Sequence, residues 1–60
     1  MSAITAKKYF ENGACSAQTF TEYTEMCQWL ALHPEAGIEA WKDHEPIDQQ
    51  QLQADVQMYQ

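Results

Sequence analysis

The chain has 60 residues and a formal net charge of −6, because nine acidic residues are offset by only three lysines and no arginine. A chain of this length forms a single domain over residues 1–60. Its charge disfavours direct binding to nucleic acid and to acidic membrane surfaces, since both are polyanionic.

Hydrophobic residues make up 45% of the chain, which supports a compact core and argues against intrinsic disorder. The amino-terminal residues lack the apolar segment of a secretory signal, and no stretch reaches membrane-spanning length. We therefore expect a cytoplasmic protein in which Cys15 and Cys27 stay reduced.

The first segment, from Ser2 to Asn12, favours a short helix. Apolar and charged residues fall on opposite sides of that helix: Ala3, Ala6, Tyr9 and Phe10 against Lys7, Lys8 and Glu11. Asn12-Gly13 would end it, because both residues tolerate the left-handed conformation found at helix ends. The same dipeptide also favours a β-hairpin turn, so residues 3–16 are open to either structure.

The clearest periodicity predicts a central helix from about Ala17 to Leu32. Ser16, or a capping box of Thr19 with Glu22, would begin it, and Pro34 would end it. Its apolar stripe, at positions i, i+3, i+7, i+10 and i+11 with one widening residue, consists of Phe20, Tyr23, Cys27, Leu30, Ala31 and Met26.

Two further helices complete the predicted fold. Pro34 suits the first turn of a helix over 34–44, in which Ile38 and Trp41 would face inward. Asp48 would cap the last helix, with Gln51 completing a capping box and with Ile47 and Leu52 at the staple positions. The sequence thus predicts an all-α domain, a small bundle of three to four short helices packed around the helix near residues 17–32.

The sequence predicts neither an enzyme nor a metal or cofactor site. Cys15, Cys27, His33 and His44 are widely spaced, whereas structural zinc ligands usually occur in close pairs. Cysteine catalysis requires an accessible thiol of lowered pKa beside its base, and nothing in the sequence brings such groups together.

The acidic residues suggest a binding surface. In helical geometry Glu22 and Glu25 bracket Trp29, while Glu35, Glu39 and Asp43 recur at i, i+4 and i+8 on the next helix. Tryptophan is enriched at binding hot spots, and carboxylates steer the approach of a basic partner. Each acidic stripe taken alone is also typical of a solvated face, and Trp29 is as readily explained as a core residue.

We therefore predict a non-catalytic protein–protein interaction module, a small acidic adaptor, inhibitor or accessory factor of the kind that a mobile genetic element encodes. Its partner would be a protein with a basic surface. The alternative is a small helix-turn-helix regulator formed by the second and third helices, or an acidic mimic of DNA. A two-fold homodimer is also predicted, with contacts from Leu52, Val56, Met58 and Tyr59.

Overall fold

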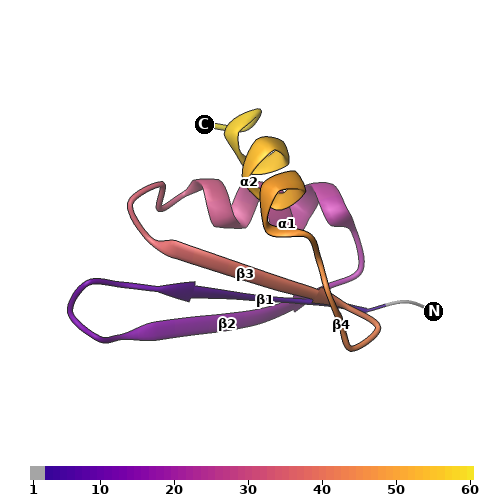
Figure 1. Cartoon of the computed structure of the whole chain (residues 1–60), viewed down its shortest axis with the longest axis horizontal. Coiled ribbons are helices and arrows are strands. Elements are labelled where there is room, and N and C mark those ends of the chain that lie inside the picture. Colours follow the sequence, from indigo (N-terminus) through magenta and orange to yellow (C-terminus); the bar gives the residue numbers. More distant parts are fainter. Residues whose placement is uncertain (1–2) are drawn as a thin grey trace.

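Two β-hairpins, each followed by a helix, make up the fold, as the computed structural model of residues 3–60 shows (Figure 1). The elements in chain order are β1 (Ile4–Tyr9), β2 (Cys15–Phe20), α1 (Tyr23–Ala31), β3 (Gly37–Lys42), β4 (Glu45–Pro46) and α2 (Gln49–Gln57). The prediction of an all-α bundle is therefore wrong, and the fold is α+β.

The strands form one antiparallel sheet in the order β2-β1-β3-β4. Both helices lie on the same side of this sheet, with α1 over β1 and β2 and with α2 against α1 and β3 (Figure 1). Neither α1 nor α2 covers the opposite face of the sheet, called the uncovered face below (Figure 1). None of the helices described in residues 3–60 is long and apolar enough to cross a bilayer.

The first hairpin corrects the predicted helix over residues 2–12 and shows that the hairpin alternative was the right one. Ser2 lies outside the described residues. Gly13 has φ of +89° and its amide donates to the Phe10 carbonyl at 3.0 Å, so the Asn12-Gly13 segment closes a tight turn. The Asn12 side chain accepts a further hydrogen bond from the Ala14 amide at 3.0 Å.

The predicted central helix is real only in its second half, since residues 15–20 belong to β2. The helix begins at Tyr23 after Glu22, without a side-chain cap, so the proposed caps at Ser16 and Thr19 are wrong. Met26, Cys27 and Leu30 point into the core as the stripe predicted.

The predicted third helix over residues 34–44 is also wrong, because residues 37–42 form β3 along β1. In a strand alternate residues share a face, so Ile38 turns toward the core while Trp41 turns toward the uncovered side. The helix-turn-helix alternative fails with it, since no second helix follows His33-Pro34 in that segment.

The last helix starts as predicted. Asp48 occupies the cap position and its carboxylate accepts a hydrogen bond from the Gln51 amide at 3.1 Å. Leu52 and Val56 face the core, and Ile47 is half-buried against it.

The core lies between the sheet and the two helices and consists of ten buried apolar residues: Ile4, Ala6, Phe20, Met26, Cys27, Leu30, Ile38, Ala40, Leu52 and Val56. Ala6 and Ala40 pair at the centre of the two middle strands, with Ile4 opposite Lys42 and Lys8 opposite Ile38. The two strands thus repeat the pattern Ile-x-Ala-x-Lys about a local two-fold axis. The repeat is unequal, because Lys8 is 1% exposed whereas Lys42 is an exposed residue.

Candidate functional site

The uncovered face of the sheet carries a mixed set of polar and aromatic side chains. Alternation along the two middle strands, set by the buried residues between them, places these on that face: Thr5, Lys7 and Tyr9 of β1, and Glu39 and Trp41 of β3. The register sets Lys7 opposite Glu39 and Thr5 opposite Trp41. These residues therefore form neighbouring rows on one surface.

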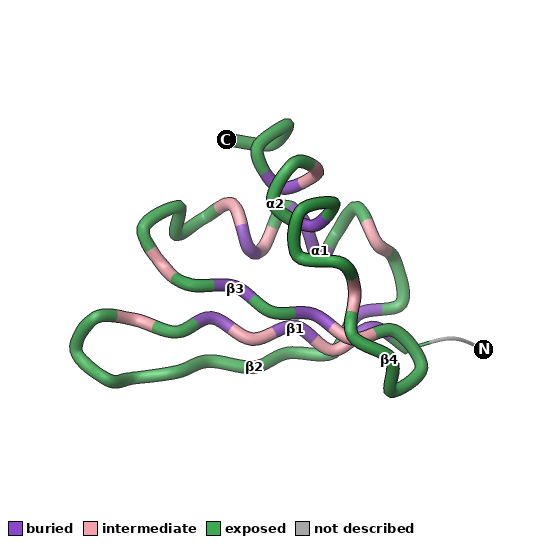
Figure 2. Tube along the Cα trace, in the orientation of Figure 1, coloured by how far each residue is buried: buried purple, intermediate pink, exposed green. Residues whose placement is uncertain are grey.

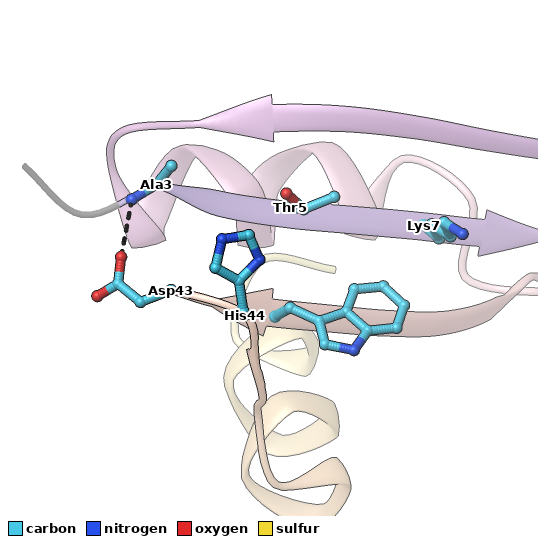
Figure 3. Close-up of a pocket in the computed structure, with 6 residues that line it drawn as sticks. Ala3, Thr5, Lys7, Asp43 and His44 are labelled. Carbon is cyan, nitrogen blue, oxygen red and sulfur yellow. Dashed lines mark hydrogen bonds between the residues drawn. The ribbon is translucent and has the colours of Figure 1, made fainter.

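A groove of about 500 Å³ lies at the end of this face where the β3–β4 turn rises beside β1. Six residues line it, shown in Figure 3: Ala3, Thr5, Lys7, Trp41, Asp43 and His44. The lining combines an indole, a cation, an imidazole, a hydroxyl and a carboxylate. Such a groove can accept a side chain that is apolar along its length and polar at its tip.

Trp41 is the largest side chain of the groove and is only half-buried. The Lys7 ammonium lies 5.6 Å from the centroid of its ring, within the range of a cation–π contact. Glu39 precedes Trp41 by two residues on the same face, and Asp43, two residues after it, lines the groove. In the sequence Trp41 therefore lies between two acidic residues.

Glu39 also affects the pKa of Tyr9. Desolvation by burial, followed by the nearby Glu39 carboxylate, raises the pKa of Tyr9 above its ordinary value. Tyr9 therefore stays protonated and can donate a hydrogen bond on this face at neutral pH.

The turn that bounds the groove is conformationally unusual. Asp43 and His44 have φ of 51° and 70°, the left-handed region that glycine and asparagine normally occupy in two-residue hairpin turns. The Asp43 amide donates to the Ala3 carbonyl at 3.2 Å, and the Ala3 amide donates to the Asp43 carboxylate at 3.4 Å (Figure 3). These bonds fix the turn against the start of β1, so the wall of the groove is held in place.

Trp29, the tryptophan that the sequence favoured, packs between the helix and the sheet. Its ring centroid lies 5.5 Å from that of Phe20, and the Lys8 ammonium lies 4.1 Å from its ring. Lys8 in turn contacts His33, with Nζ 2.9 Å from Nδ1. Trp29 is a half-buried residue that packs against the core.

The predicted acidic residues are divided between the two sides of the sheet. Glu22 and Glu25 are exposed at the start of α1, and Glu35 is exposed in the loop after it. Glu39 and Asp43 lie with Trp41 on the other side. Of the predicted binding surface, Glu25 and Trp29 share α1, while Glu39 and Asp43 lie on β3 and the turn after it, next to the other tryptophan in the sequence.

The four residues predicted for self-association are also split. Leu52 and Val56 belong to the core, with exposures of 0% and 3%, and offer no surface to a second copy. Met58 and Tyr59 are exposed, at 81% and 42%.

The two cysteines of the chain lie in different environments. Burial raises the pKa of Cys27, which keeps this thiol protonated and unreactive. Cys15 is exposed on β2, and both cysteines are free. Among the described residues, no three His, Cys, Asp or Glu side chains are grouped as metal ligands.

A sequence signal for the Trp41 site was present in the spacing of Glu39, Trp41 and Asp43. This spacing of two residues matches a strand, whereas Glu35, Glu39 and Asp43 also fit the spacing of a helix. Comparison of the chain with protein-family models, with curated proteins and with solved structures gives no match.

Proposed function

We propose that the chain is a non-catalytic protein-binding module that contacts a basic partner protein through the uncovered sheet face around Trp41. The observation that carries this proposal is a half-buried tryptophan on an uncovered sheet face, between Glu39 and Asp43 and beside a groove of about 500 Å³. A cytoplasmic setting, in which the exposed thiol of Cys15 stays reduced, belongs to the same proposal.

Trp41 supplies the apolar contact. Tryptophan is among the commonest hot-spot residues because it buries a large area and loses little conformational entropy. The cation–π contact from Lys7 and the fixed turn at Asp43 and His44 hold the groove in one shape before a partner arrives. Preorganisation of this kind lowers the entropic cost of association.

The negative net charge of the chain favours a basic partner. The net charge of −6 attracts a cationic protein over a distance of about a Debye length, ~10 Å. Glu39 and Asp43 then provide local acceptors for lysine or arginine beside the indole. An arginine of the partner could also stack on the ring of Trp41, so that one side chain makes both the ring contact and an ion pair with a carboxylate.

The test compares two substitutions that change the net charge equally. Immobilised wild-type protein, Glu39→Lys, Trp41→Ala and Glu25→Lys are used to capture proteins from the native host, and the captured proteins are quantified by mass spectrometry. Glu25 lies on α1, on the other side of the sheet. Thermal melts of each variant exclude unfolding as the cause of a loss.

We expect one or a few basic proteins to be retained by wild type and by Glu25→Lys, and to be lost with Glu39→Lys and Trp41→Ala. Equal loss with both lysine variants would mean that only net charge attracts the captured proteins. Retention of the same proteins by Trp41→Ala would contradict the proposal.

A further inference from the structure

The two edges of the sheet differ in how well they are protected from further pairing. The β4 edge has only two residues and contains Pro46, features that block strand addition. The β2 edge is a regular strand of six residues that is paired with β1 on one side only. In an antiparallel ladder alternate residues direct their amide and carbonyl groups away from the partner strand, so β2 presents unpaired groups along its outer side.

Side chains do not shield this edge either. Residues 15–19 are exposed, and the tube of β2 is green along nearly its whole length (Figure 2). The strand sequence, Cys-Ser-Ala-Gln-Thr-Phe, contains no charged residue and no proline. Proteins that remain monomeric usually place lysine, proline, a bulge or a covering loop at such an edge. β2 carries neither of the first two, although the chain as a whole is strongly acidic.

We propose that β2 pairs antiparallel with β2 of a second copy of the chain, with the two-fold axis at Ala17. In this register Ala17 faces its own symmetry mate across the axis, with two small side chains at the point of closest approach. Ser16 then lies opposite Gln18, and Cys15 lies opposite Thr19, so neighbouring pairs are polar or small. No like charges are opposed along β2.

The charges around the edge oppose the approach of a second copy. Lys7 of β1 lies next to Ala17 in the register, and Lys8, next to Ser16, is buried. The two copies repel each other through their net charge of −6 each, and added salt screens that repulsion. The dimer is therefore strengthened by salt, the opposite of an association driven by ion pairs.

The dimer has a consequence for the uncovered sheet face. The two-fold axis runs perpendicular to the plane of the sheet. It extends the sheet of one copy into that of the other and leaves all helices on the same side. Both Trp41 grooves then open on one face, and neither is covered by the new contact because β1 separates them from β2. The proposed β2–β2 dimer does not depend on the proposed binding of a basic partner.

Sedimentation equilibrium of the wild type, Ala17→Lys and Gln53→Lys tests the proposal. Both substitutions add one positive charge, but Gln53 is exposed on α2, away from the edge. We expect the wild type to dimerise with a dissociation constant of ~10–100 μM, and Gln53→Lys to associate at least as well. Ala17→Lys should weaken association at least tenfold, because two lysines would face each other across the axis. A monomeric wild type at ~0.5 mM, or dimerisation of Ala17→Lys equal to that of the wild type, would overturn the proposal.

A crosslinking experiment decides the matter if Ala17→Lys proves unstable. Ala17→Cys and Gln53→Cys are each made together with Cys15→Ser and oxidised mildly. Cβ atoms of directly opposed residues lie ~4.5–5.5 Å apart, a separation that relaxes readily into a disulfide. Rapid formation of a disulfide dimer is expected for Ala17→Cys alone. Equal rates for the two variants would show that β2 is not the contact.

Discussion

The Lys8 ammonium lies 2.9 Å from Nδ1 of His33 while the lysine side chain is enclosed between the sheet and α1. Desolvation lowers the pKa of Lys8, and the charge of Glu35 offsets this only in part. The buried cation therefore carries a net cost.

We expect Lys8→Met to raise the free energy of unfolding at pH 7 by about 1 kcal/mol, because an apolar side chain of similar length removes the desolvation cost. Lys42→Met, at the equivalent but exposed position of β3, should change it by less than ~0.5 kcal/mol. Urea unfolding followed by circular dichroism measures both. Destabilisation by Lys8→Met comparable to a core truncation would contradict this account of Lys8.

Lys8 also makes the stability of the fold depend on pH. Its pKa in the folded state is below the ordinary 10.5, so the unfolded state binds more protons between these two values. Wild-type stability should therefore rise with pH in that window, and Lys8→Met should lack the rise. The window is best followed below pH ~10, because the raised pKa of Tyr23 makes stability fall at higher pH.

A second prediction concerns the contact between the two helices. The Tyr23 hydroxyl of α1 donates to the Asp55 carboxylate of α2, and this hydrogen bond, followed by that from Gln51, lowers the pKa of Asp55. Tyr23→Phe should cost about 1–2 kcal/mol at pH 6. The difference from wild type should shrink as pH falls through the lowered pKa of Asp55, since a protonated carboxyl no longer favours the contact. Urea titrations at several pH values between 6 and 2 would show a constant difference if the account is wrong.

A third prediction concerns the turn beside the groove. His44 has φ of 70°, which costs an L-residue other than glycine, asparagine or aspartate about 1 kcal/mol. His44→Gly should therefore raise the melting temperature by about 4–8 °C. His44→Ala is the control, because it removes the imidazole and keeps the strain. Equal melting temperatures for the two variants would show that the turn is not strained.

The sequence predicted the parts of the fold that depend on local signals. The cap at Asp48, the start of α2 and the end of α1 ahead of Pro34 all follow from neighbouring residues, whereas Leu52 and Val56, predicted to contact a second copy, are buried in the core. The pairing of β1 with β3 joins segments that are distant in the sequence, which periodicity within a short window does not report.

Lys8 explains why β1 was mistaken for a helix. Its strand alternates inward Ile4, Ala6 and Lys8 with outward Thr5 and Lys7, but a lysine at an inward position hides the alternation. In β3, glutamate, alanine and lysine favour helices, and pairing with β1 and β4 overrides that preference. The helical spacing led to Trp29 as the candidate tryptophan, whereas the strand spacing of β3 places Trp41 on the uncovered face.

Fluorescence of two single-tryptophan variants tests the central claim most directly, with the basic protein retained in the capture experiment as the titrant. Trp29→Phe leaves Trp41 as the only tryptophan, and Trp41→Phe leaves Trp29. If the uncovered sheet face is the binding surface, the partner should shift the Trp41 emission and protect it from iodide quenching, while the Trp29 signal stays unchanged. A response from Trp29 with none from Trp41 would contradict the account and return the binding site to the helical side.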